Sequence, residues 1–111
     1  MLSKTQVKTV TATGISMTKY VMEVYPIGTQ FNNVSGVYCF INNNNTPIYI
    51  GETDNLNRRL NLEIQNHQQW QCIKKNGSTH VAVMLVNGYK QQRLDIETDI
   101  RQNYNTACNM Q

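Results

Sequence analysis

Two short apolar runs lie close together in the chain and limit the possible folds more than any other feature. Residues 37–41 (VYCFI) and 48–50 (IYI) are separated by the polar segment 42–46 and by Pro47. Runs this short, rich in β-branched and aromatic residues, are typical of buried strands rather than helices. The sequence therefore predicts a β-hairpin with a polar connection in the middle of the chain.

Three further segments predict strands on either side of this hairpin. Residues 7–13 and 19–25 are rich in Val, Thr and Tyr, and residues 81–86 form another apolar run followed by the turn dipeptide Asn-Gly. Because strands that follow one another closely usually pair antiparallel, we expect a largely antiparallel sheet.

Helices are expected after the hairpin and at the end of the chain. Leu56, Leu60 and Ile64 recur every four residues and predict a helix capped by Thr53 or Asp54. Another helical turn or two is expected from Trp70 onward, and the last helix is expected at residues 91–104, with its apolar ridge formed by Ile96, Ile100 and Tyr104. Strands and helices in this order predict an α+β fold.

Length and composition set the broad class of protein. A chain of 111 residues forms one domain, and its net charge of +3 suits a polyanionic partner without requiring one. There is no signal-peptide core and no apolar run near the roughly 20 residues of a membrane span, so we expect a soluble, cytoplasmic protein with no membrane partner. The cysteines contain no CxxC pair and are expected to be reduced thiols: Cys39, Cys72 and Cys108.

Glu97 occupies an unexpected position on the last helix. At about 100° per residue, its side chain falls inside the apolar arc of that helix. A carboxylate facing a core is costly unless it is paired or holds a metal ion. Two interpretations remain open: an ion pair with Arg93 or Arg101, each four residues away, or a metal ligand.

Other polar side chains in the predicted core regions have ordinary structural explanations. Arg59 flanks the apolar stripe of the first helix, where an arginine often lies along the core edge. Tyr38 and Tyr49 lie on opposite strands of the hairpin and are expected to pack across them.

Taken together, these residues resemble the GIY-YIG nuclease superfamily. Residues 36–38 (GVY) and 49–51 (YIG) stand for its two triplets, with tyrosines 11 residues apart. Arg59, Glu97 and Asn109 match in order the catalytic arginine, the metal-binding glutamate and a closing asparagine of the family. Residues 25–31 before GVY also resemble compact single-domain members similar to the nuclease module of the excision-repair incision subunit.

The resemblance implies a fold and a domain division. The expected core is a mostly antiparallel three-stranded sheet flanked by helices, with one or two extra N-terminal strands. Residues 1–34 would be an N-terminal β extension and residues 35–111 the GIY-YIG core, together forming a single domain.

The resemblance also implies a function, the metal-dependent hydrolysis of phosphodiester bonds in nucleic acid, with DNA expected. Glu97 would hold one Mg²⁺ or Mn²⁺, and Arg59 would bind the scissile phosphate. Tyr38 would orient or deprotonate the attacking water, with support from Tyr49. Three further residues would assist: Gly36 and Gly51 would keep the hairpin open to nucleic acid, and Asn109 would anchor the C-terminal loop.

The chain departs from the family pattern at several positions. Glu52 replaces a residue that is more often Ser, Gln or Lys, so it would either help to hold a metal or repel DNA. Glu63 stands where relatives often have histidine, and His67 is expected to substitute for it.

The basic residues are few, which leaves a second function open. Those expected to bind nucleic acid are Arg58, Arg59, Lys74 and Lys75. Because affinity for nucleic acid depends on neutralised phosphates, the alternative is a module of the same fold with little or no activity that binds nucleic acid or a protein. A monomer or homodimer is expected, with a protein partner as a further source of specificity.

Overall fold

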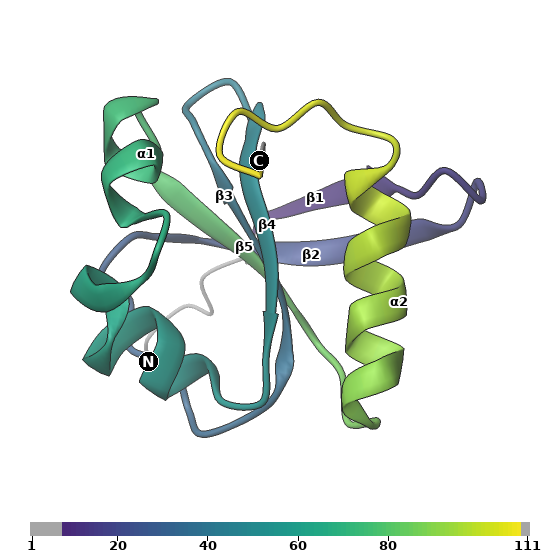
Figure 1. Cartoon of the computed structure of the whole chain (residues 1–111), viewed down its shortest axis with the longest axis horizontal. Coiled ribbons are helices and arrows are strands. Elements are labelled where there is room, and N and C mark those ends of the chain that lie inside the picture. The colour runs from purple at the N-terminus through teal and green to yellow at the C-terminus, as the bar shows by residue number, and fades with distance from the viewer. Residues whose placement is uncertain (1–7, 110–111) are drawn as a thin grey trace, which may run out of the picture.

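A computed structural model describes residues 8–109, which form five strands and four short helical elements (Figure 1). The strands are β1 (Thr9–Thr13), β2 (Lys19–Pro26), β3 (Gly36–Ile41), β4 (Pro47–Thr53) and β5 (His80–Leu85). The helical elements are η1 (Arg58–Leu62), η2 (Ile64–Asn66), α1 (Trp70–Lys75) and α2 (Lys90–Arg101). No helix within residues 8–109 is long and apolar enough to cross a membrane.

All five strands belong to one antiparallel sheet with the order β1-β2-β5-β3-β4. The expected α+β class and antiparallel pairing are therefore confirmed. The sheet has five strands rather than three, because β2 pairs with β5 and adds the N-terminal hairpin to the expected core of β3, β4 and β5. Residues 1–7 of the predicted N-terminal extension lie outside the described residues.

Helical elements cover both faces of the sheet and divide the core into two clusters (Figure 1). On one face, Leu56, Leu60 and Ile73, from the segment between β4 and the end of α1, pack on Phe40 and Val83 of the sheet. The cluster on the opposite face contains Met22, Val37, Ile50, Ala82 and Ile100 of α2. Strand β3 is buried along its whole length, as expected of a central strand that is apolar on both faces.

The segment after β4 is not the continuous α-helix that the spacing of leucines predicts. Neither Thr53 nor Asp54 caps it; instead the Asn55 side-chain oxygen accepts a hydrogen bond from the Arg58 N–H at 3.0 Å. The chain then forms a π-helical turn, closed by a bond of 2.8 Å from the Glu63 N–H to the Arg58 carbonyl, and a 3₁₀ turn follows. The wider turn changes the direction of the side chains that follow it.

The last helix, α2, is shorter than predicted. It begins at Lys90 and ends at Arg101, so Tyr104 lies in the following loop. Tyr104 still packs against the core, and its hydroxyl accepts a hydrogen bond from the Thr13 N–H at 2.9 Å. The C-terminal loop thereby joins α2 to the end of β1.

The expectation that all three cysteines are reduced thiols is wrong. Cys72 of α1 and Cys108 of the C-terminal loop form a disulfide, with Cα atoms 5.8 Å apart. The loop returns to the sheet, where the Cys108 N–H donates to the Ile48 carbonyl at 3.0 Å. A sequence separation of 36 residues gave no indication of this contact. Cys39 is a buried free thiol, as predicted.

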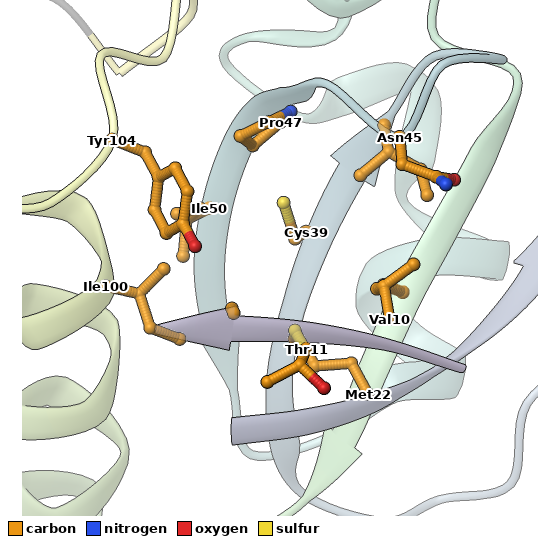
Figure 2. Close-up of a pocket in the computed structure, with 12 residues that line it drawn as sticks. Val10, Thr11, Met22, Cys39, Asn45, Pro47, Ile50, Ile100 and Tyr104 are labelled. Carbon is orange, nitrogen blue, oxygen red and sulfur yellow. The ribbon is translucent and has the colours of Figure 1, made fainter. Parts of the chain in front are cut away.

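A small apolar cavity of about 60 Å³ lies on the α2 face of the sheet (Figure 2). Its lining includes Met22, Ile50, Ile100 and Tyr104, and most of the lining side chains are aliphatic. None of the side chains predicted to be functional lines it. We therefore regard it as a gap in the packing of the core, separate from the functional site.

Candidate active site

Four elements bring the predicted catalytic side chains to one edge of the sheet. Tyr38 lies on β3, Tyr49 on the edge strand β4, Arg59 on η1 and Glu97 on α2. The rings of the two tyrosines are 6.2 Å apart between centroids. Arg59 and Glu97 both act electrostatically on the two tyrosine hydroxyls, so charges from opposite faces of the sheet meet beside β4.

The two tyrosines differ in exposure. Tyr38 is only 1% exposed, and burial raises the pKa of its hydroxyl, with Tyr49 adding to the effect and Arg59 opposing it. Burial also raises the pKa of Tyr49, and the nearby Glu97 carboxylate raises it further. Tyr49 is partly exposed and Tyr38 is not, so of the two only Tyr49 is in contact with solvent.

His67 is a buried hydrogen-bond partner of Tyr38. Its Nε2 lies 2.9 Å from the Tyr38 hydroxyl oxygen, and its Nδ1 accepts a hydrogen bond of 3.1 Å from the Gln69 N–H. A backbone N–H can only donate, so Nδ1 carries no proton and neutral His67 must carry its proton on Nε2. Burial, assisted by Arg59, lowers the pKa of His67 to about 4, which keeps the ring neutral near pH 7. His67 therefore donates to the Tyr38 oxygen.

Glu97 faces inward, as its helical position predicted, and its side chain is 14% exposed. Arg101 Nη1 lies 3.4 Å from Glu97 Oε1, so of the two predicted ion pairs the one with Arg101 forms. Burial raises the pKa of the Glu97 carboxyl, Arg101 opposes this rise, and Glu52 contributes to it.

The second oxygen of Glu97 has no hydrogen-bond partner within residues 8–109 and is not completely buried. Within the described residues, Glu97 Oε2 makes no hydrogen bond. Every fully buried side-chain nitrogen or oxygen in this part of the chain has a hydrogen-bond partner. Glu97 Oε2 is therefore not completely buried, and its lone pairs are not used by a hydrogen bond within residues 8–109, as a cation ligand requires.

Arg93 pairs with Glu52 rather than with Glu97. Arg93 Nε lies 2.9 Å from Glu52 Oε2, and the Arg93 side chain is 7% exposed. Arg93 Nη1 also donates to the Gly88 carbonyl at 3.3 Å. This ion pair balances the charge of Glu52, which follows the second triplet. Sequence reasoning missed it because the two residues are 41 positions apart.

A shallow groove of about 520 Å³ opens at the end of β4, between η1 and the start of α2. Two of its basic side chains are neutralised, Arg58 by Asp54 and Glu63 and Arg93 by Glu52. No carboxylate pairs with Arg59 in the part of the chain that the structure describes. The groove is lined by Glu52, Thr53, Asp54, Arg58, Arg59, Glu63, Lys90 and Arg93.

Two predicted nucleic-acid contacts lie away from this groove. Lys74 and Lys75 are exposed at the end of α1 and do not line it. The Lys74 ammonium lies 5.6 Å from the centre of the Trp70 ring, in a cation–π contact. The structure therefore does not bring these lysines together with Arg59.

The glycines of the two triplets make room for the protein's own atoms. A Cβ at Gly36 would lie 2.6 Å from the Met84 carbonyl oxygen, and one at Gly51 would lie 2.5 Å from the Tyr38 ring and hydroxyl. Gly51 is the cross-strand partner of Tyr38, so the ring folds over it. From the sequence, these glycines are expected to leave space for nucleic acid, but the space is filled by the protein itself.

Asn109 holds the C-terminal loop against the edge strand. Its Oδ1 accepts from the Ile50 N–H at 2.8 Å, and its Nδ2 donates to the Ile50 carbonyl at 2.9 Å. The Thr106 hydroxyl also donates to Oδ1 at 2.6 Å. These bonds fix β4 between Tyr49 and Gly51, where the sheet has no further strand.

The donor set is compatible with a divalent cation held mainly by one carboxylate. Residues 8–109 contain no group of three or more His, Cys, Asp or Glu side chains that could enclose a metal ion. Mg²⁺ does not need such a cage, because it commonly takes one or two carboxylates together with waters and substrate phosphates. Glu97 Oε2, which makes no hydrogen bond within these residues, fits this kind of site.

Comparison with known proteins identifies the family. The family model described as the GIY-YIG catalytic domain matches residues 34–110. The chain belongs to the GIY-YIG family. A similar crystal structure is that of the N-terminal GIY-YIG endonuclease domain of UvrC from Thermotoga maritima, a point mutant bound to its catalytic divalent cation. It is 24% identical, has a TM-score of 0.60, and the match covers 72% of this chain and 87% of that chain. No curated protein matches the chain.

This GIY-YIG domain departs from the family pattern in a way that the geometry explains. Glu63, at the position where relatives often have histidine, is on the surface and pairs with Arg58 at 3.6 Å. His67 reaches Tyr38 instead, from the extended residue that follows η2. The π-helical and 3₁₀ turns between Arg59 and His67 turn the chain so that a histidine eight residues after the arginine points into the site.

Proposed function

We propose that this GIY-YIG domain is a divalent-metal-dependent endonuclease that hydrolyses phosphodiester bonds in nucleic acid, with DNA as its substrate. One observation carries the proposal. Tyr38, Tyr49, Arg59 and Glu97 come from four different elements, yet Arg59 and Glu97 both lie close enough to the two tyrosines beside the edge strand β4 to act electrostatically on their hydroxyls.

Glu97 is the proposed ligand of Mg²⁺ or Mn²⁺, through Oε2, the oxygen that makes no hydrogen bond within residues 8–109. When bound, the cation would supply positive charge to the phosphate and acidify a coordinated water. The Arg101 contact holds Glu97 Oε1 and thereby orients the carboxylate. Desolvation strengthens the attraction of this carboxylate for a cation, because water competes less well in a partly buried site.

Arg59 is the proposed phosphate-binding residue. Its planar guanidinium can donate two parallel hydrogen bonds to phosphoryl oxygens. No carboxylate between residues 8 and 109 neutralises it, whereas Arg58, Arg93 and Arg101 are each paired. Its charge is therefore available to stabilise negative charge that develops on the phosphate in the transition state.

Exposure favours an exchange of roles between the two tyrosines. Tyr38 was expected to contact the attacking water, but it is almost completely buried. We assign the water contact to Tyr49, which is partly exposed. Tyr38 then supports Tyr49 from the interior, and the His67 Nε2–H hydrogen bond holds the Tyr38 oxygen in place.

The competing function is a binding module without activity. The groove carries three acidic side chains beside four basic ones, which would weaken binding to a polyanion. The presence of all four proposed catalytic side chains supports the enzyme. Binding to nucleic acid that weakens with salt would separate a nucleic-acid module from a protein-binding module.

Incubation of the purified protein with labelled nucleic acids tests the proposal. The substrates are single-stranded, duplex and branched DNA and an RNA of matched sequence, each with Mg²⁺, with Mn²⁺ or with EDTA. We expect cleavage of at least one DNA substrate with a divalent cation and none with EDTA. Cleavage that EDTA does not affect, or no cleavage of any substrate, would contradict the proposed function.

A further inference from the structure

Tyr89 is an exposed aromatic residue adjacent in sequence to the groove that Arg59 lines. It is 88% exposed and directly precedes Lys90, which lines the groove. A large apolar side chain so far from the core contributes little to the stability of the fold. An aromatic face next to a cation is the combination with which proteins bind unpaired nucleotides, since the ring stacks on a base and the cation binds a phosphate.

The turn that precedes Tyr89 is connected by hydrogen bonds to strand β4. Arg93 donates to the Gly88 carbonyl at 3.3 Å and is held by Glu52 at 2.9 Å. Glu52 follows Gly51 on β4, so one buried ion pair ties the Gly88–Tyr89 peptide to the strand that carries Tyr49. The backbone just before Tyr89 is therefore tied to β4.

Lys90 lies on the same side of α2 as Glu97. Residues 90, 93, 97 and 101 are spaced by three or four positions and form one stripe along the helix. Seven residues separate Lys90 from Glu97, which corresponds to about 10 Å along the helix axis at 1.5 Å per residue. This distance exceeds the spacing of consecutive phosphates along a strand, so Lys90 and a cation at Glu97 would contact different nucleotides of the same strand.

Lys90 is the second basic side chain in the groove whose charge is available to a phosphate. Arg58 and Arg93 are neutralised by carboxylates. Of the basic side chains that line the groove, Arg59 and Lys90 have no carboxylate partner within residues 8–109. One unpaired cation therefore lies beside the catalytic tyrosines and the other at the start of α2, next to Tyr89.

We propose that Tyr89 and Lys90 form a subsite for an unpaired nucleotide near the cleaved bond, about 10 Å along α2 from Glu97. Tyr89 stacks on the base and Lys90 binds its phosphate. The inference rests on the proposed nuclease function and adds a substrate class to it: nucleic acid in which the strand beside the cleavage point is single-stranded, as in a flap or a frayed end. A base inside a duplex cannot stack on Tyr89, because both of its faces are already covered by neighbouring bases.

Fluorescence anisotropy with labelled DNA tests the subsite in a Glu97→Ala background, which prevents cleavage during the measurement. Two DNAs of equal length are compared, one with a single-stranded flank and one fully duplex. Tyr89→Ala should weaken binding of the flanked DNA about tenfold and change binding of the duplex little. Tyr89→Phe should retain most of the affinity, since the ring is kept. Lys90→Ala should reduce the salt dependence of binding by about one phosphate contact.

Matched controls come from the opposite end of the sheet. Met17 is 80% exposed in the β1–β2 turn, and Lys19 is exposed at the start of β2. Met17→Ala and Lys19→Ala should leave the affinity for both DNAs unchanged.

The outcomes separate the subsite from the proposed function. Equal loss of affinity on both DNAs, or none, in Tyr89→Ala would overturn the subsite while the nuclease proposal stands on its own cleavage assay. If neither DNA binds and none is cleaved by the protein with Glu97 intact, both proposals fail together.

Discussion

Reduction of the Cys72–Cys108 disulfide should destabilise the fold substantially. The bond closes a loop of 36 residues that contains β5 and the whole of α2. In the chain-entropy description, opening a loop of this length restores conformational freedom to the unfolded chain worth about 4 kcal/mol. A domain of this size has a total stability of about 5–15 kcal/mol, so the loss is a large fraction of it.

Urea denaturation with and without dithiothreitol measures this effect. Trp70 is the only tryptophan in the chain, begins α1 and packs on Phe40 with ring centroids 6.0 Å apart, so its fluorescence reports unfolding. With a slope near 2 kcal/mol per molar urea, the midpoint should fall by about 2 M on reduction. Cys72→Ser should show the lower midpoint without reductant and should not respond to reductant.

A thiol count in denaturant provides an independent check. The chain has three cysteines, so one thiol, that of Cys39, should titrate before reduction and three after it. An unchanged urea midpoint with reductant, or three free thiols in the untreated protein, would refute the disulfide and the stability reasoning built on it.

Three further predictions concern groups around the site. The pKa of His67 is about 4 in the folded protein and near 6.5 in the unfolded chain. The contribution of His67 to the free energy of unfolding should therefore be constant above about pH 6.5 and fall as the pH decreases toward 4. Urea titrations over a series of pH values should show that His67→Phe lacks this pH dependence. Asn109→Ala removes two hydrogen bonds to Ile50 and should cost about 1–2 kcal/mol, measured in the same way, with no change if the loop is unbound. Glu52→Ala leaves the buried Arg93 guanidinium without its carboxylate partner and should lower the free energy of unfolding by about 3 kcal/mol. Glu52→Gln keeps a hydrogen-bond acceptor and should lower it less; equal losses in the two variants would argue against an ion pair.

The strands and the orientation of Glu97 could be predicted because each depends on residues close together in the sequence. The hairpin and its flanking strands follow from short β-branched and aromatic runs, whose alternatives are few. The inward position of Glu97 follows from helical geometry alone. In these cases the nearest neighbours in sequence dictate the outcome.

Long-range contacts determined what the sequence did not show. The segment after β4 has helical spacing, yet Asn61 Nδ2 donates to the Thr29 carbonyl and its Oδ1 accepts from the Phe31 N–H, both at 2.8 Å. These bonds to a distant loop accompany the π-helical turn in place of a regular helix.

In the candidate active site, too, long-range contacts could not be predicted from the sequence. The Glu52–Arg93 ion pair and the Tyr38–His67 hydrogen bond join residues 41 and 29 positions apart. No periodic pattern in the sequence encodes such pairs, because their geometry depends on how whole elements pack.

The most direct test of a metal-dependent nuclease is the single-turnover cleavage rate of Glu97→Gln with Mg²⁺ or Mn²⁺. Asp95→Asn, an exposed carboxylate two residues away on α2, is the matched control. We predict that Glu97→Gln lowers the rate by at least about a hundredfold, as expected for loss of a metal ligand or a charge at the reacting phosphate, while Asp95→Asn retains the wild-type rate. Cleavage by Glu97→Gln at the wild-type rate would contradict the account.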